Sequence, residues 1–211
     1  MTRFAALAHP VRPDLTDAME REWQRLAAPG TWWSGRERVA IARATRQARA
    51  SANVDSGALP EAAIDAVHRL SVAPASTTRD VVAAQPAAGV EHAAYVELVG
   101  VVSRLAAIDA THRALGAELE PLPEPLPGDP SRTPPPTQAL AGKAFVPMVG
   151  GASIVGALSL VPEEMEAQRD IHGPFYLSYE DMALYDYQAG LHRTQMELVA
   201  TRTSAINECF Y

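Results

Sequence analysis

The chain has 211 residues, of which 47 % are hydrophobic and 20 % charged, so it can form a packed core and its composition argues against wholesale disorder. The net charge of −7 argues against a nucleic-acid partner and against an anionic-membrane surface. A single cysteine excludes a disulfide and a multi-cysteine metal site within this chain, and we expect a soluble, cytoplasmic protein. The most apolar run, residues 95–110, is interrupted by Glu97, Arg104 and Asp109, so we do not expect it to span a membrane.

Helical periodicity organises the first half of the chain. Apolar residues at i, i+3 and i+4 spacing predict helices over residues 14–26, 34–52, 60–70, 77–84 and 91–115. The second of these begins with Ser34 and Glu37 at the Ser-x-x-Glu spacing of a capping box. The last is apolar nearly all round in its middle and ends at Gly116, a left-handed cap. Such a helix belongs in the centre of a bundle.

The segment from residue 120 to 136 has a different character, because it holds eight prolines. Proline fixes φ and removes a backbone donor, so we expect an extended, polyproline-like linker. Beyond it, helices are predicted over residues 153–160, 162–171, 178–189 and from 194 onward. Ser178 and Asp181 cap the third of these, and Thr194 and Glu197 form a second capping box. No stretch alternates convincingly as a strand, and the predicted fold class is all-α.

Two further groups of side chains have structural interpretations. Five arginines on the second predicted helix form a basic stretch: Arg36, Arg38, Arg43, Arg46 and Arg49. We interpret them as a solvated helix face rather than a phosphate or nucleic-acid site, because no aromatic stacking residues are interleaved. The histidines lack metal-ligand spacing, and His112 is expected to interact with the dipole of the long helix. The tryptophans are expected in the core or at a subunit contact.

The chemistry is predicted to lie in residues 197–211. Asn207 is a residue type that caps helix N-termini, and if it begins a new helix, Cys209 lies in the first turn. Unpaired backbone N–H groups there lower a thiol pKa and populate the nucleophilic thiolate. Glu197, on the preceding helix, would then accept and return protons as general base and acid. Glu197 and Cys209 are therefore the candidate catalytic residues.

This segment resembles the alkylhydroperoxidase D / carboxymuconolactone decarboxylase superfamily. Its redox members carry Glu, eleven residues, Cys-x-x-Cys, three residues and His, and often read Asn-x-Cys-x-Tyr-Cys at the first cysteine. Glu197 and Cys209 have that spacing, since 209 − 197 = 12, and residues 207–211 read Asn-Glu-Cys-Phe-Tyr. The second redox residue and the histidine would lie beyond Tyr211.

A weak internal repeat accompanies the motif. A shift of 160 residues superposes Ser34 on Thr194 and Glu37 on Glu197. The chain resembles a two-repeat alkylhydroperoxidase-related subgroup, which implies an alkylhydroperoxidase D-like helical bundle with an incomplete second repeat. The implied parts are a degenerate first repeat over 1–119, a Pro-rich linker over 120–146 and the N-terminal part of the second repeat over 147–211.

The first repeat is expected to be structural. Applying the motif from Glu37 puts Arg49 and Ala52 at the cysteine positions and Ser56 at the histidine position. These side chains cannot carry out dithiol chemistry.

The resemblance implies a thiol- or selenol-dependent peroxidase-like oxidoreductase, with a small hydroperoxide as substrate, a thiol system as reductant, no metal or haem cofactor, and a homo-oligomeric state. Some family members are selenoproteins, whose selenocysteine codon is ordinarily read as a stop. We therefore hypothesise a selenocysteine directly after Tyr211, with an artificial or natural chain end as the alternatives. As written, the chain is expected to be inactive or impaired.

Two other functions remain open at the level of the sequence. One is a non-catalytic helical module for structure or oligomerisation. The other is a non-redox, carboxymuconolactone decarboxylase-like enzyme, in which Cys209 can be replaced without loss of activity.

Overall fold

Helices account for most of the secondary structure in the computed structural model, which describes residues 4, 10–51, 53, 57–150 and 156–208. The all-α class predicted from the sequence is confirmed. The helices in chain order are α1 Pro13–Ala27, α2 Gly35–Arg49, α3 Glu61–Val72, α4 Arg79–Ala83, α5 His92–Ala114, α6 Pro162–Phe175 and α7 Arg193–Ile206.

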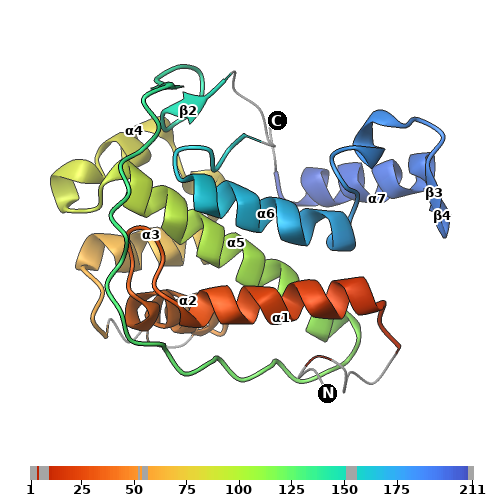
Figure 1. The fold of residues 1–211 in the computed structure, drawn as a ribbon, viewed down its shortest axis with the longest axis horizontal. Coiled ribbons are helices and arrows are strands. Elements are labelled where there is room, and N and C mark those ends of the chain that lie inside the picture. The colour runs from red at the N-terminus through yellow and green to blue at the C-terminus, as the bar shows by residue number, and fades with distance from the viewer. Residues whose placement is uncertain (1–3, 5–9, 52, 54–56, 151–155, 209–211) are drawn as a thin grey trace.

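Helix α5 lies in the centre of the bundle, as its sequence predicts (Figure 1). It contacts α1, α2, α3 and α6, and buried side chains occur on all its sides. Its end is also as predicted: Gly116 has φ +64°, its N–H donates to Arg113 O at 3.1 Å, and the next N–H, of Ala117, donates to His112 O at 2.9 Å. These two bonds form a Schellman motif. No helix within the described ranges is long and apolar enough to span a bilayer.

The core fills the space between these helices. Trp23 and Trp33 are buried in it, as expected, and each indole N–H donates to a backbone carbonyl, of Pro121 and Ala94 respectively. His112 is buried as well, and its Nδ1 lies 2.9 Å from the carbonyl oxygen of Ile108, one turn earlier. This contact ties the imidazole to the backbone of its own helix, and the expected interaction of His112 with the helix dipole stays a prediction.

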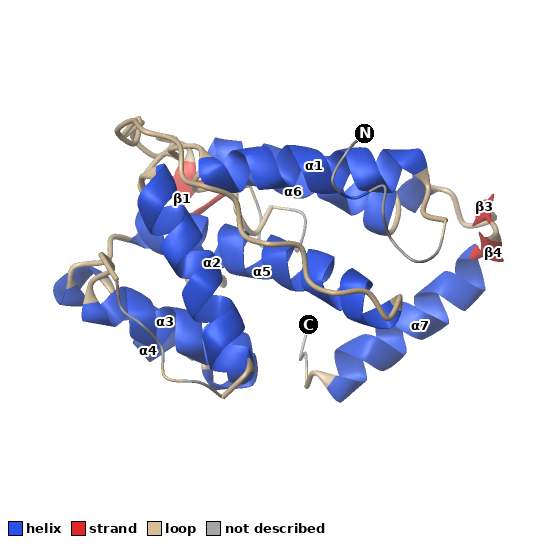
Figure 2. Cartoon of the chain, turned by 90° about the horizontal axis from the view of Figure 1, so that it is seen from below, coloured by secondary structure: helices blue, strands red, loops and turns tan. Residues whose placement is uncertain are grey.

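The Pro-rich segment, residues 120–136, is extended and contains neither helix nor strand, as predicted. It runs along the first two helices (Figures 1 and 2), and its backbone pairs with the last residue of α1 and with the segment between α1 and α2. Leu126 N–H donates to Ala27 O at 2.8 Å, and the N–H groups of Ser131 and Arg132 donate to the carbonyls of Gly30 and Thr31. The segment is thus part of the bundle surface.

After the Pro-rich segment, the structure departs from the predicted helices. Ala139–Leu140 (β1) pairs antiparallel with Met148–Val149 (β2), and residues 156–160 form turns; the remainder of the helix predicted over 153–160 lies outside the described residues. Helix α6 begins at Pro162, as predicted, and packs on α1 and α5.

The helix predicted over 178–189 does not form. Ser178 does cap the following turn, since its Oγ accepts from Asp181 N–H at 3.0 Å, but that turn is a 3₁₀ helix of three residues, Asp181–Ala183. A hairpin follows, in which Gln188–Ala189 (β3) pairs with Leu191–His192 (β4) around Gly190 at φ +82°. Glycine adopts this left-handed conformation without strain, so a tight turn forms where the helix was expected. The strands are too short to alternate visibly in the sequence.

The capping box predicted for α7 is wrong. His192, delivered by β4, is the N-cap: its Nδ1 accepts from Thr194 N–H at 3.3 Å, and Gln195 Oε1 accepts from His192 N–H at 2.9 Å. The box of α2 forms as predicted, with Ser34 N–H donating to Glu37 Oε2 at 2.8 Å and Glu37 N–H to Ser34 Oγ at 3.3 Å. The proposed match between Ser34 and Thr194 therefore does not extend to their roles as caps.

Candidate functional site

Glu197 lies in the second turn of α7 and is free of a capping role. Its Oε1 accepts two hydrogen bonds, from the Tyr176 hydroxyl at 2.6 Å and from Arg193 Nε at 2.7 Å. Tyr176 comes directly after α6, whereas Arg193 is the first residue of α7. The Glu197 side chain remains 45 % exposed, so the carboxylate is both held in place and reachable from solvent.

The protonation states within this cluster follow from its hydrogen bonds. The bond from Tyr176 and then the Arg193 guanidinium hold the pKa of Glu197 below its usual range. Burial and then the bond to Glu197 raise the pKa of Tyr176 to about 12. At neutral pH Glu197 is therefore ionised, and the Tyr176 hydroxyl stays protonated and donates a hydrogen bond to it. This arrangement can accept a hydrogen bond from a substrate or thiol, with the phenol as the neighbouring proton donor.

Contacts with the preceding helix and turn fix the two partners of Glu197. The Tyr176 ring meets His172 edge to face, with ring centroids 5.7 Å apart, and Tyr179 lies against the same imidazole at 5.1 Å. Arg193 Nη1 donates to the carbonyl of Met182 at 3.1 Å. Arg193 could have been found from its i, i+4 spacing to Glu197. Tyr176 could not, because the hairpin brings it to Glu197 from 21 residues away.

Cys209, the second predicted site residue, lies outside the described residues. The residues before it overturn the predicted N-cap at Asn207, which instead ends α7: its N–H and its Nδ2 both donate to Thr203 O at 3.0 Å. An N-cap residue has extended backbone, whereas Asn207 has φ −86° and ψ 7°, and Glu208 after it has φ 55°. Glu197 and Ile206 lie nine helical residues apart, or about 14 Å at 1.5 Å per residue. Direct proton exchange between Glu197 and Cys209 thus requires the chain to turn back along α7.

A second cluster of charged side chains, which the sequence analysis did not anticipate, lies inside the bundle. We call it the buried ion network; its members come from α1, α2, α5 and α6 and are Glu22, Arg38, Glu97, Arg104 and Glu164. Arg38 Nη1 pairs with Glu97 Oε1 at 2.5 Å and with Glu164 Oε1 at 3.0 Å. Arg104 pairs through Nε with Glu22 at 2.7 Å and through Nη2 with Glu164 at 2.5 Å.

Two glycines make room for the buried ion network. A Cβ atom at Gly30 would lie 1.9 Å from Glu97 Oε1, and one at Gly100 would lie 2.1 Å from Glu164 Oε2. Any other residue at these positions would displace a buried charge. The network thus depends on the absence of two side chains as well as on the presence of five.

The buried ion network corrects two expectations. Arg38 is only 3 % exposed and Arg46 pairs with Asp109 at 2.7 Å, so the interpretation of the basic stretch as a solvated face is wrong for these two; Arg36, Arg43 and Arg49 are exposed. The charges that interrupt the apolar run of α5 are buried and paired. Burial opposes ionisation of Glu164, yet Arg104 and Arg38 together hold its pKa below the usual range. Burial raises the pKa of Glu97.

The part of the chain that the structure describes contains no group of three His, Cys, Asp or Glu side chains able to hold a metal ion. Comparison of the chain with models of known protein families, with curated proteins and with solved structures gave no match.

Proposed function

We propose that the protein is a thiol- or selenol-dependent peroxidase-like oxidoreductase of the cytoplasm, with Glu197 and Cys209 as its catalytic residues. One observation carries the proposal: Glu197, at the motif spacing from the only cysteine, is not used as a helix cap and is instead ionised, exposed and held by Tyr176 and Arg193. The bond from Tyr176 comes from the end of α6 and orients the carboxylate, whose side chain stays 45 % exposed.

The proposed chemistry begins with attack of the Cys209 thiolate on the O–O bond of a hydroperoxide. Sulfur is oxidised to the sulfenic acid, and the alkoxide leaves as an alcohol after taking up one proton. A second thiol or selenol then attacks the sulfenic sulfur, forming a sulfur–sulfur or sulfur–selenium bond and releasing water. Further thiol from the reducing system cleaves that bond and returns Cys209 to its thiol. Residues 1–211 hold one cysteine, so in an assay of these residues an external thiol is the resolving group, and we expect slow turnover.

The test is hydroperoxide consumption by the native chain and by Cys209→Ser, with excess small thiol as reductant. We expect the native chain to consume hydroperoxide faster than the thiol does without protein. The Cys209→Ser variant should consume it no faster than the thiol alone. Trapping of one sulfenic acid on Cys209 by a 1,3-dicarbonyl reagent should accompany the activity. Equal turnover of the two proteins would overturn the proposal and favour the non-redox alternative.

We also propose the alkylhydroperoxidase D-like, two-repeat organisation, with the parts 1–119, 120–146 and 147–211. Its support is the confirmed capping box of α2 in the first part and a helix, α7, at the corresponding place in the last. The different caps of α2 and α7 mean that the two repeats have diverged at their helix starts.

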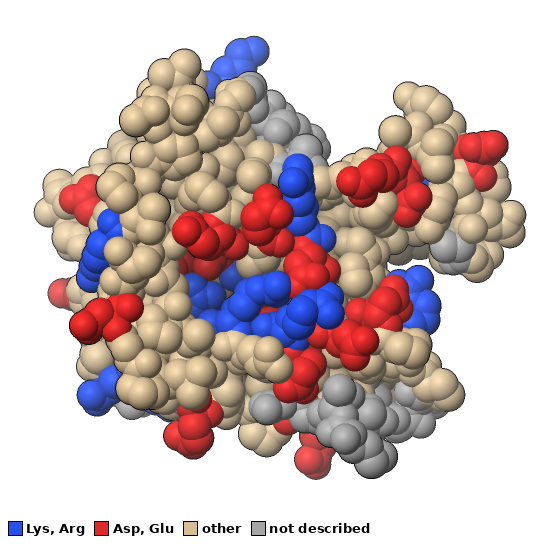
Figure 3. Space-filling model, in the orientation of Figure 1, with Lys and Arg blue, Asp and Glu red and all other residues tan. Residues whose placement is uncertain are grey.

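A second candidate function, self-association, has its own supporting observation in α7. Its side chains are all at least partly exposed, and Leu198, Val199 and Ile206 are 71 %, 61 % and 70 % exposed. The helix projects to the side of the bundle (Figures 1 and 3). An unsupported helix of 14 residues is marginal in water, so a partner that covers its apolar residues would stabilise it. We propose that a second copy of the chain does so.

Sedimentation analysis of native protein and two variants tests self-association. Val199 and Ile206 share one helix face at i, i+7 spacing, so Val199→Glu should dissociate an oligomer. Thr201→Glu adds the same charge on the opposite face and should leave the mass unchanged. A monomeric native protein would rule out the proposed self-association.

A further inference from the structure

The described bundle contains a cavity of ≈380 Å³ between the end of α1, α6 and the Pro-rich segment. Its polar lining comprises Arg25, Thr31, Arg38, Ser131, Glu163 and Glu164, and its apolar wall comprises Ala28, Pro29 and Ala167. Figure 3 shows this face of the molecule, with basic side chains gathered in a hollow and acidic side chains around it. The volume falls within the range of small-ligand sites.

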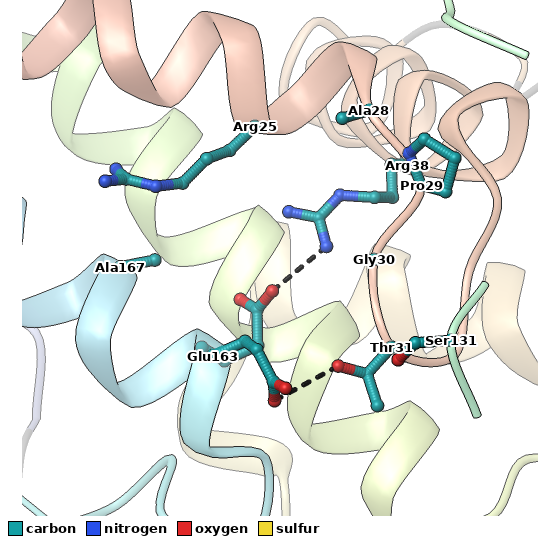
Figure 4. A pocket seen from close by; sticks show the side chains of 10 residues that line it. Arg25, Ala28, Pro29, Gly30, Thr31, Arg38, Ser131, Glu163 and Ala167 are labelled. Atoms are coloured by element: carbon teal, nitrogen blue, oxygen red, sulfur yellow. Dashed lines mark hydrogen bonds and ion pairs between the residues drawn. The ribbon is translucent and has the colours of Figure 1, made fainter. Parts of the chain in front are cut away.

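Arg38 reaches into this cavity with an unused hydrogen-bonding edge. Both of its ion pairs use Nη1, whereas its buried Nε has no partner among the described residues. In Figure 4 the Arg38 guanidinium points in among the side chains that line the cavity, toward the carboxylates on the Glu163 side. Unpaired donors on a residue that is 3 % exposed are rare, because burial without a partner is unfavourable.

Other arginines of the same chain show what this edge normally binds. Arg21 donates through Nε and Nη2 to the two oxygens of Asp170, at 2.9 and 2.7 Å. Arg46 donates through the same two atoms to the two oxygens of Asp109, at 3.0 and 2.7 Å. The Nε–Nη2 edge of a guanidinium matches the spacing of a carboxylate. On Arg38 the Nε of this edge is buried without a partner among the described residues, and the side chain lines the cavity.

The carboxylates around the cavity, in contrast, already have donors. Glu164 accepts from Arg38 at one oxygen and from Arg104 at the other, and Glu97 accepts from Arg38 and from the N–H of Trp32. Glu163 accepts from the Thr31 hydroxyl at 3.3 Å. The lining therefore has an unpaired donor, the Nε of Arg38, so a ligand of this cavity should supply a hydrogen-bond acceptor and not a positive charge. Because the four charged lining residues sum to zero, one negative charge is tolerated better than two.

We propose that this cavity binds a small monocarboxylate, which accepts a hydrogen bond from the Arg38 guanidinium. Arg25, which also pairs with Asp170 and Glu22, lies at the same cavity. The short apolar tail of the ligand packs on Ala28, Pro29 and Ala167. The site shares no residue with Glu197 or Cys209. The proposal of a carboxylate site can therefore be supported or contradicted independently of the proposed peroxidase function.

The test follows the arginine Nε–H resonances of the ¹⁵N-labelled protein during titration with propionate at constant ionic strength. Propionamide, which has the same shape and no charge, is the ligand control. We expect a saturable shift of the Arg38 resonance with propionate and none with propionamide. Absence of the shift, an equal shift with propionamide, or stronger binding of phosphate than of propionate would each overturn the proposal.

Two variants locate the binding in this cavity without removing any ion pair. Ala28→Leu places a larger side chain in the cavity wall and should weaken propionate binding by at least about tenfold. Ala110→Leu makes the same change on the exposed face of α5 and should bind as the native protein does. Native-like binding by Ala28→Leu, in a protein that retains its circular dichroism spectrum, would place the ligand elsewhere and contradict the assignment.

Discussion

The buried ion network and the cluster around Glu197 combine arginine and glutamate in opposite surroundings. In the network, Arg38 and Arg104 are almost completely buried, and Glu164 lies between them with both oxygens bonded. In the cluster of Glu197, Tyr176 and Arg193, which we call the α7 cluster, Glu197 is 45 % exposed. Both described bonds to its carboxylate fall on a single oxygen. The network therefore holds four helices together, whereas the Glu197 carboxylate retains an accessible side. The same pair of residue types serves structure in one region and is available for chemistry in the other.

The largest effect that would test this contrast is loss of a buried partner. Glu164→Ala leaves Arg38 and Arg104 without their shared carboxylate, and we expect it to lower the free energy of unfolding by about 3–5 kcal/mol. Glu197→Ala, which removes a half-exposed partner, should lower it by about 1 kcal/mol or less. Urea denaturation of the two variants gives both numbers. Similar losses in the two would erase the distinction between the regions.

A smaller effect concerns the room that glycine provides. Gly100→Ala forces Glu164 Oε2 away from a Cβ atom that would lie 2.1 Å from it, and we expect a loss of about 2 kcal/mol in the free energy of unfolding. Gly142→Ala is the matched control, because its Cβ would meet nothing within 4 Å, and it should change stability by about 0.5 kcal/mol at most. A harmless Gly100→Ala would mean that the network can shift without cost.

The smallest effect is the alkaline titration of the α7 cluster. The pKa of Tyr176 is raised to about 12, above its ordinary value, so its bond to Glu197 stabilises the protein fully below the ordinary tyrosine pKa of about 10. That stabilisation is lost as the pH rises through about 12. The difference in ultraviolet absorbance between native protein and Tyr176→Phe follows the titration. Glu197→Gln should move the pKa of Tyr176 part of the way toward its ordinary value, since the burial of Tyr176 remains. An unchanged titration of Tyr176 would contradict its hydrogen bond to Glu197.

Local signals in the sequence predicted local structure well. The capping box at Ser34, the left-handed Gly116 and the helix start at Pro162 are all found, because each depends on residues within one turn. The failures at α7 are also local in origin. Gly190 allows a hairpin that shifts the helix start to Arg193, and Asn207, a residue suited to either end of a helix, ends one where it was expected to begin one.

Long-range pairing could not be predicted from one sequence. Glu97 and Arg104 were interpreted as interruptions of an apolar run, whereas their partners, Arg38, Glu22 and Glu164, lie 59 to 82 residues away along the chain. No spacing rule relates such positions. Of the candidate site, the sequence pointed to Glu197, whose catalytic role stays a prediction, and missed its partner Tyr176, which lies 21 residues away.

The most direct test of the central claim, that Glu197 serves chemistry rather than stability, is the rate at which a hydroperoxide oxidises Cys209. The rate is measured as sulfenic acid trapped over time and detected by mass spectrometry, in the native chain, in Glu197→Gln and in Tyr176→Phe. We predict that Glu197→Gln slows the oxidation by about 10²-fold, with Tyr176→Phe intermediate, while both variants unfold within about 1 kcal/mol of the native protein. Equal oxidation rates in the three proteins would contradict the claim.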